Sequence, residues 1–374
     1  MFLFREAGWD DEDAIYDLAR YLNTLNLPPE RAFIHELLER SLASFDGLED
    51  FNQDRRFVFV LEDPDGKVIG TSMIHAQHGT FDQPHVFFTV TTEERHGLLG
   101  PIPDDEGEER FEHVHMEHTM LYLSQTYKGP SELGGLVMHP DWRGHPERLG
   151  RLLSLGRFVF IAAFRSWIRD RLLAELLPPL YEGPGGSTMS PLWDALGRRF
   201  TGLSYTEADR LSRINKSFIW DLFPRMPVQA SLLPESVQKI IGTVGPNTVG
   251  ALQLLESVGF RYTGRVDPFD GGPHVEAETD SVTLVRDARA YRAEPGEPVA
   301  SALPAIVGTR SESFPHFRAI STPVLAPDDA EVVRLSAAAM ARLGLAEDDP
   351  ESQAYVSLRP QRRRGDSTLR RAGM

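Results

Sequence analysis

Residues 139–151, HPDWRGHPERLGR, carry arginines and glycines at a spacing suited to holding a phosphorylated ligand. They follow an apolar run, 132–138, that is typical of a strand, and they precede leucines and aromatics at helical spacing over 149–167. Backbone amides at a helix start have no partner inside the helix and attract anions, while arginines add positive charge. The candidate ligand residues are Arg143, Gly144, Arg148, Gly150 and Arg151. A diphosphate cradle and an ordinary strand-to-helix connection are equally compatible with this stretch alone.

Composition limits the classes of chemistry and of partner. The 374 residues include no cysteine, which excludes disulfides, thiolate catalysis and cysteine-ligated metals. The formal net charge of −16 disfavours nucleic acid and anionic lipid as partners. No apolar run is long enough for a membrane span, and residues 1–5 are too short a run for a signal peptide. We therefore expect a cytoplasmic protein.

Apolar periodicity predicts the elements that must position these residues. Strands are expected over 2–5, 56–62, 67–74, 132–138 and 172–180, and helices over 10–21, 29–45, 149–167, 191–197, 251–258 and 336–343. The last three helices are expected to end at Gly197, Gly259 and Gly344. Residues 103–110 indicate an exposed acidic loop, and 292–298 indicate a linker.

Two segments resemble the motifs of the GNAT N-acyltransferases. Residues 136–144 with 149–153 are similar to the acyl-CoA-binding motif, and 247–260 are similar to the second GNAT motif. The resemblance implies a GNAT-like α/β fold with a mixed sheet. In that fold one strand separates from its neighbour and exposes amides to the acyl carbonyl and the pantetheine. The loop behind this strand holds the pyrophosphate, so the resemblance favours the diphosphate cradle.

A narrower resemblance is to the arginine N-succinyltransferases. Matching segments occur in the family's order, among them PDWR (140–143), AAFR (162–165), SPLW (190–193), LGRRF (196–200) and FDGGP (269–273). The likeness runs from the first strand to about Leu358. It implies transfer of a succinyl group from succinyl-CoA to the α-amine of arginine or a related amino acid. It also implies no permanently bound cofactor, with acyl-CoA as co-substrate.

The resemblance also implies a domain organisation. We expect an N-terminal GNAT-like acyl-CoA-binding unit over 1–185, a second GNAT-like unit over 186–290 and a small β-rich C-terminal domain over 291–358. Residues 359–374 hold six arginines against one aspartate and predict a disordered tail. Because members of the family associate as more than one chain type, a homo- or hetero-oligomer is expected.

Amide formation from a thioester calls for donors to the oxyanion and for partners of both substrates. The family's succinyl-CoA contact maps onto Leu136, and the amides of Leu136, Val137 and Met138 are the expected oxyanion and pantetheine donors. Cationic candidates for the succinyl carboxylate are Arg198, Arg199 and Lys216, and acidic candidates for a guanidinium substrate are Glu132, Asp270 and Glu276. Each charged candidate is also compatible with a plain surface or structural charge.

The family's proton-donating histidine is missing. Its position in a Val-His-Pro stretch corresponds to Gly245, which has no side chain to transfer a proton. His274, directly after FDGGP, and His139, at the end of the motif strand, are the candidate replacements, alongside a base acting through a water chain. The alternative function is a regulatory or partner subunit that binds a CoA ester or an amino acid without turnover.

A second group of histidines raises the question of a metal. His113 and His115 would share one face of a strand and form a ligand pair. Their spacing matches no strong signature, and the family resemblance implies no metal. The sequence therefore predicts no metal site.

Overall fold

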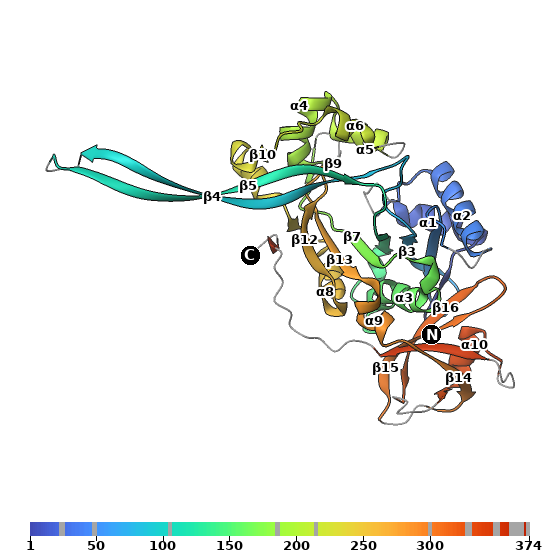
Figure 1. Ribbon diagram of the computed structural model, residues 1–374. Coiled ribbons are helices and arrows are strands. Elements are labelled where there is room, and N and C mark those ends of the chain that lie inside the picture. Colours follow the sequence, from blue (N-terminus) through green and yellow to red (C-terminus); the bar gives the residue numbers. More distant parts are fainter. Residues whose placement is uncertain are drawn as a thin grey trace.

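The computed structural model describes a compact body from which one long two-stranded ribbon projects (Figure 1). The described residues are 1–21, 27–46, 51–103, 107–183, 188–212, 216–297, 301–325, 331–346, 352–358 and 370–371. Within them, one large mixed sheet has the strand order β10-β5-β4-β12-β13-β7-β6-β3-β2-β1-β16-β15-β18-β14-β17. The expected α/β fold with a mixed sheet is confirmed.

Seven strands form the part of the sheet that positions the site. They are β1 (Leu3–Glu6), β2 (Arg56–Glu62), β3 (Val68–His75), β6 (Ser131–Met138), β7 (Arg171–Glu175), β12 (Arg261–Val266) and β13 (Pro273–Glu278). The strands predicted over 2–5, 56–62, 67–74 and 132–138 are confirmed to within one residue or two. The strand predicted over 172–180 ends earlier, at Glu175, ahead of Pro178 and Pro179, which cannot donate a ladder hydrogen bond.

Helices cover both faces of these strands. One face carries α1 (Glu12–Ala19) and α2 (Arg31–Phe45), and the other carries α3 (Leu149–Ala163) and α8 (Val249–Val258). In β2, Val58 and Val60 pack with α1 and α2, whereas Phe57, Phe59 and Leu61 pack with α3. A strand buried on both faces is apolar throughout rather than alternating, which explains the run 57–61.

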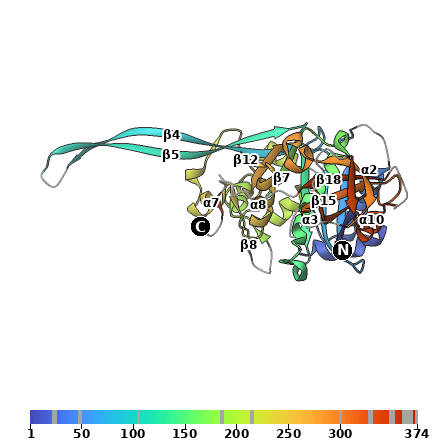
Figure 2. The same cartoon turned by 90° about the horizontal axis from the view of Figure 1, so that it is seen from below.

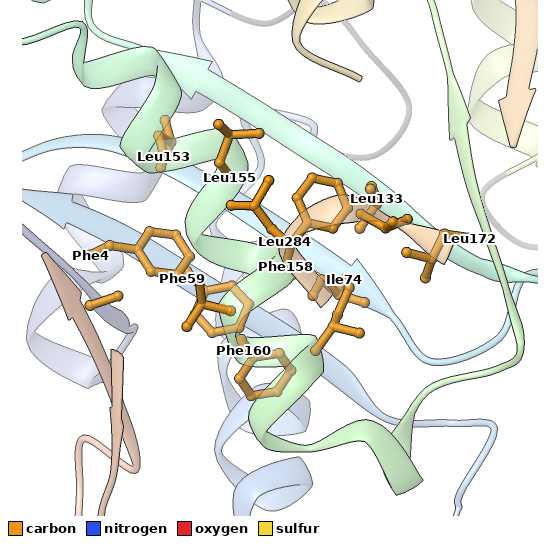
Figure 3. Packing of buried hydrophobic residues seen from close by; sticks show 14 of the residues in the cluster. Phe4, Phe59, Ile74, Leu133, Leu153, Leu155, Phe158, Phe160, Leu172 and Leu284 are labelled. Atoms are coloured by element: carbon orange, nitrogen blue, oxygen red, sulfur yellow. The ribbon is translucent and has the colours of Figure 1, made fainter. Parts of the chain in front are cut away.

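Helix α3 forms the centre of the main core. Phe158 and Phe160 lie among Phe4, Phe59 and Leu133 from the surrounding strands (Figure 3). Because α3 is enclosed by strands and by the C-terminal part, nearly all of its residues are buried. Its first turn, which faces the loop 139–148, is therefore held in place by a rigid body.

Two of the three predicted helix stops are confirmed. Gly259 and Gly344 end α8 and α10 (Ala337–Leu343) with φ of 118° and 72°. The stop at Gly197 is wrong, because a π-helical turn, Trp193–Gly197, continues into α4 (Arg198–Thr201). A Cβ at Gly197 would lie 2.4 Å from the buried Trp193 ring, so this glycine permits close packing rather than a helix end.

The ribbon consists of β4 (His85–Pro103) and β5 (Glu109–Thr126), which pair along most of their length. It extends far from the body in both views (Figures 1 and 2). Of the acidic loop predicted over 103–110, Pro103 ends β4 and Glu109 and Arg110 begin β5, while residues 104–106 fall outside the described residues. Sequence patterns did not predict the ribbon, since most of its outer part is exposed on both faces and shows no apolar alternation.

An insertion between β7 and α8 forms a small layer of its own. It contains β8 (Tyr181–Glu182), β9 (Thr188–Met189), β10 (Val228–Gln229) and β11 (Thr243–Val244), with α5 (Tyr205–Ser212), α6 (Ser217–Leu222) and α7 (Glu235–Ile240). Its apolar residues, including Trp193 and Ile219, pack on Phe88 and Val266 of the sheet. The insertion thereby covers one side of the β12–β13 hairpin.

The C-terminal part extends the same sheet. It contains β14 (Arg289–Pro295), β15 (Leu303–Arg310), β16 (Phe317–Val324), β17 (Val332–Leu335), β18 (Gln353–Leu358), α9 (Thr283–Arg286) and α10. Strand β16 pairs with β1, and β7 pairs with β13 across the expected boundary at 185/186. The predicted linker 292–298 is wrong over residues 292–295, which belong to β14. The division into domains stays a prediction.

The chain end was predicted to be disordered over 359–374. Residues 359–369 and 372–374 of this tail lie outside the described residues. The described pair Arg370–Arg371 forms β19, parallel to β11. No helix in the described part of the chain is both long and apolar enough to cross a membrane.

Candidate active site

Strands β6 and β7 separate soon after they meet. They pair in parallel at Ser131 with Leu172 and at Glu132 with Leu173, and at no later position of the two described strands. Beyond this point β6 stays with β3 and β7 stays with β13. This opening between neighbouring strands is the arrangement that the GNAT resemblance implies.

A β-bulge lies in β6 beside the opening. Between Gly134 and Val137, β6 uses one residue more than β3 uses between Met73 and Thr71. Gly135 has φ of 55°, and a Cβ there would lie 2.4 Å from the side chain of Met73, so this position favours glycine. The extra residue leaves part of the Leu136 region without a ladder partner, which suits the predicted backbone role of Leu136, Val137 and Met138.

The loop behind β6 leads to free amides at the start of α3. Arg148 adopts a left-handed conformation with φ of 55° directly before helical Leu149. A left-handed residue followed by a right-handed one turns consecutive amides towards one point and forms an anion-binding nest. No protein acceptor binds the amide of Leu149 or Gly150 among the described residues.

Several other amides of the loop are already used. The amides of Trp142 and Arg143 donate within a 3-10 turn, and those of Arg148 and Arg151 donate to His145 and Arg148. Only part of the loop can therefore bind a diphosphate through its amides, and Leu149 and Gly150 form the free pair at the helix start. The turns that shape the loop use the amides of Trp142, Arg143, Arg148 and Arg151, whereas Leu149 and Gly150 stay open beside the left-handed Arg148.

The charged and glycine candidates surround this free pair. Arg143 donates from Nε to the carbonyl oxygen of Met138 at 3.2 Å, which ties it to the end of β6. Arg148 is exposed and Arg151 is half-buried. Gly144 and Gly150 both face open space, since a Cβ at either would meet no atom within 4 Å. A diphosphate would therefore approach the helix start without a steric barrier.

A second cluster of functional groups is buried between β6, β7 and β13. Glu175 of β7 lies at its centre, with Oε1 3.1 Å from His85 Nε2, 3.3 Å from His274 Nε2 and 3.7 Å from His78 Nε2. Glu132 of β6 binds the other ring nitrogen of His78, at 2.6 Å. Neighbouring strands place these side chains together because they project from the same face of the sheet.

The acidic end of this cluster is formed by the turn between β12 and β13. Asp267 accepts from the amide of Phe269 at 2.6 Å, and Asp270 accepts from that of Gly272 at 2.7 Å. Lys216, at the start of α6, lies with Nζ 3.8 Å from Asp267. Burial, reinforced by neighbouring Asp267, raises the pKa of Asp270 well above its usual range. A bound cation would restore the charged form of this carboxyl.

Burial also sets the protonation of the ring groups. It lowers the pKa of His85 to about 3 and lowers the pKa of His274. Although burial opposes it, attraction to Glu132 raises the pKa of His78. Burial likewise opposes ionisation of Glu175, but the facing His274 and His85 hold its pKa well below the usual range. The cluster therefore presents the neutral imidazoles of His85 and His274 to an ionised carboxylate.

Sequence candidates divide between this cluster and other places. Glu132, Asp270, His274 and Lys216 lie in or beside it. Glu276 is engaged by Arg171 and Arg265, with Arg265 Nη1 3.1 Å from its Oε1. Arg198 and Arg199 are exposed on α4. Composition could not distinguish these charged groups, and only the fold separates them.

His139 lies at the other end of β6 from Glu132. Seven residues of extended strand, about 20 Å, separate the two. His139 borders a cavity of about 510 Å³ together with Tyr21, Lys67 and Val68, and its ring meets Tyr21 edge-on at 5.2 Å. His139 and His274 therefore cannot act on the same amine.

Four members of the cluster, Asp267 among them, were not predicted from the sequence. His78 and His85 flank a turn outside the family motifs, and nothing in their spacing marks them as partners. Glu175 had a usable signal, because it is the one charged residue in the run LLAELL, 172–177. A lone carboxylate in a buried strand requires a partner.

Gly245 is fixed by packing. A Cβ at this position would lie 2.6 Å from the carbonyl oxygen of Pro178, and the Gly245 amide donates to Leu177 at 2.8 Å. We expect Gly245→His to lower the free energy of unfolding by about 1–3 kcal/mol and to give no gain in activity. Thermal unfolding of this variant beside Gly250→Ala, an open position, measures the effect. An unchanged melting temperature with increased turnover would show that the glycine is not a packing requirement.

The separated strands, the bulge and the free amides at α3 define the class: the protein is an acyltransferase with a GNAT-like fold. Residues 2–284 match the family described as arginine N-succinyltransferase beta subunit. The chain belongs to the arginine N-succinyltransferase family.

Individual relatives agree with this assignment. Arginine N-succinyltransferase subunit beta of Pseudomonas aeruginosa is 34% identical over 341 residues, which cover 89% of this chain and 94% of the relative. Arginine N-succinyltransferase of Shigella boydii is 33% identical, with 86% and 88% covered. The solved arginine/ornithine succinyltransferase subunit AI of Pseudomonas aeruginosa has a TM-score of 0.77 and 25% identity, and the alignment covers 96% of this chain and 99% of that one.

Proposed function

We propose that this protein transfers a succinyl group from succinyl-CoA to the α-amine of arginine or a closely related amino acid. The observation that carries the proposal is the opening between β6 and β7 beside the free amides of Leu149 and Gly150, in a chain of this family. The relatives are named for arginine, and one solved relative for arginine and ornithine. Succinyl-CoA acts as co-substrate and is not retained.

The chemistry places the reacting atoms in the opening. The amine nitrogen attacks the thioester carbon, the C–N bond forms, and the C–S bond breaks as the thiolate leaves. The amine loses a proton to a base, and the thiolate takes one up. Amides of the bulge around Leu136 stabilise the oxyanion. No covalent enzyme intermediate is needed, in agreement with the absence of cysteine from the chain.

The remaining roles fall to the buried cluster and its edge. Asp270 and Asp267 match a cationic acceptor side chain, and Lys216, at their edge, is the best-placed cation for the succinyl carboxylate. Of the two sequence candidates for proton transfer, His274 lies in the cluster and His139 does not. Gly245 stands at the position of the family's proton-donating histidine and has no side chain that could transfer a proton.

A substrate panel tests the proposal. The full chain is assayed for thiol release and for acylated product with acetyl-CoA and succinyl-CoA against arginine, ornithine, lysine and citrulline. We expect the highest kcat/KM for succinyl-CoA with arginine or ornithine. Binding of succinyl-CoA by calorimetry without turnover of any pair would instead support the non-catalytic subunit. If the chain showed no binding of succinyl-CoA and no turnover of any pair, both functions would be refuted.

We also propose that the protein assembles with further chains. The Pseudomonas aeruginosa relatives are named as subunits, which supports association with a second copy or a related chain. The molar mass of the purified chain in solution tests this proposal.

A further inference from the structure

The ligand atoms of the buried cluster converge on one point. Three imidazole nitrogens, Nε2 of His78, His85 and His274, lie 3.7, 3.1 and 3.3 Å from the same oxygen, Oε1 of Glu175. Two triads of ligand atoms, those of His78, His85 and Glu175 and those of Glu175, Asp267 and His274, each lie within 4.8 Å of one another, and Glu175 belongs to both. We propose that His78, His85, His274 and Glu175 bind one divalent transition-metal ion such as Zn²⁺.

The three distances to Glu175 Oε1 match edges of a tetrahedral coordination sphere. Zn²⁺ binds histidine nitrogen and carboxylate oxygen at about 2.0–2.2 Å, and the edge of a tetrahedron of that radius is about 3.3–3.6 Å. The three nitrogen–oxygen distances bracket this edge. Three histidines and one carboxylate form a donor set of the kind that zinc and neighbouring metals use in proteins without cysteine ligands.

The surroundings of His78 orient this ligand as metal sites require. His78 uses Nδ1 to contact Glu132 at 2.6 Å, which leaves Nε2 directed at Glu175. A carboxylate on the far nitrogen of a metal-bound histidine fixes its tautomer and raises its basicity. Glu132 is itself only 2% exposed, so this outer contact is part of the buried framework.

Without an ion, the cluster leaves polar atoms unsatisfied. His85 and His274 are fully buried, and neither ring nitrogen of either residue makes a hydrogen bond to the described protein. Glu175 Oε1 also makes none. Each buried polar atom without a partner costs about 1–3 kcal/mol. A metal ion gives Nε2 of both rings and Glu175 Oε1 a partner at once.

A guanidinium does not fit this end of the cluster as well. It presents planar N–H donors suited to paired carboxylate oxygens, whereas three of the four converging atoms here belong to imidazole rings. The carboxylates Asp267 and Asp270, beside Lys216, suit the organic cation better. The assignment makes His274 a metal ligand in place of the proton-transferring group expected from the sequence.

A second histidine cluster supplies an internal control. On the ribbon, His115 stacks on His96 across the strands at 4.7 Å, and Glu94 lies 3.7 and 3.8 Å from the two rings. This group differs from the predicted pair His113–His115, because His113 lies opposite Leu98. The side chains of His96, His115 and Glu94 are 48–73% exposed. Water can therefore satisfy their polar atoms, and no buried group of this cluster requires an ion.

Metal binding is measured on the full chain without either substrate. The protein as isolated is analysed for transition metals, then stripped with a chelator and titrated with Zn²⁺ by calorimetry and with Co²⁺ by visible absorption. We expect one equivalent per chain, the intense absorption of tetrahedral Co²⁺, and a higher melting temperature with Zn²⁺. His85→Ala and His274→Ala are each expected to weaken Zn²⁺ binding at least 100-fold. His96→Ala/His115→Ala is the matched control and is expected to bind normally.

The outcomes distinguish this site from binding on the ribbon and from no binding at all. Failure of the wild-type chain to bind Zn²⁺ or Co²⁺ would overturn the proposal. Loss of binding in the ribbon variant alone would assign the metal to the ribbon and equally overturn it. Since the wild-type titration needs no variant, a misfolded His85→Ala does not prevent the test. The inference is independent of the proposed transferase activity, because binding is measured without turnover.

Discussion

Gly150→Asp is expected to raise the KM for succinyl-CoA about 30-fold with less than a twofold change in kcat. Gly150 is the second residue of α3, its amide is free, and a Cβ there meets open space. A carboxylate at this point repels the diphosphate and competes for the amides, which we take as a loss of about 2 kcal/mol. The fold should persist, because a negative charge near a helix start stabilises the helix.

The chain contains a matched control for this substitution. Gly250 is the second residue of α8 and also faces open space. Gly250→Asp therefore makes the same change at the same place of another helix and should leave both constants unchanged. Steady-state kinetics of the two variants, with Gly150→Ala as the steric control, measures the difference. Equal effects of the two aspartates would refute the assignment of the diphosphate to α3.

Asp270→Asn is expected to raise the KM for arginine about 30-fold while leaving turnover of citrulline unchanged. A hydrogen bond to a charged partner contributes about 1.5–3 kcal/mol, and the uncharged citrulline does not depend on it. The substitution keeps Oδ1, which accepts from the Gly272 amide at 2.7 Å, so the turn should be retained. The variant removes only the charge that a guanidinium would meet.

Exposed Asp221 of α6 provides the comparison. Asp221→Asn makes the same chemical change on the neighbouring inserted layer, at an exposed position. Its arginine and citrulline kinetics should equal those of the wild type. An unaltered ratio of arginine to citrulline efficiency in Asp270→Asn would place the guanidinium elsewhere, among the other carboxylates.

Much of the fold was predictable because the local preferences of the residues agree with the burial that the tertiary structure gives them. Strands such as 56–62 are apolar throughout since helices cover both of their faces, and their β-branched and aromatic residues favour extended chain. The helix ends at Gly259 and Gly344 could be predicted because glycine readily adopts the left-handed backbone that both residues show. The helix end predicted at Gly197 was wrong because this glycine allows close packing against Trp193, a contact that a local sequence pattern cannot reveal.

The site was predictable only where its residues follow one another in the chain and form a recognisable motif. The cradle was located because loop, glycine and helix start are consecutive in the chain. Its individual donors depend on turns that occupy the amides of Trp142 and Arg151, which sequence does not specify. The buried cluster combines residues from β4, β6, β7 and β13, so its members are separated by up to about two hundred positions.

The ribbon shows the limit of periodicity. Most of the outer part of β5 has no buried face, so its polar and apolar residues carry no consistent alternation. Its pairing with β4 instead runs along both strands, with one irregularity between Leu99 and Ile102. Because the outer part of the ribbon packs against no core, its strands need no alternation of apolar and polar residues, and the sequence does not reveal them.

A crystal structure of the full chain with succinyl-CoA tests the central claim most directly. We predict diphosphate oxygens within about 3 Å of the amides of Leu149 and Gly150, a normal hydrogen-bond distance. We also predict that the thioester lies in the opening between β6 and β7 beside Leu136. A diphosphate bound away from the start of α3, or an opening that stays closed to the pantetheine, would contradict this assignment.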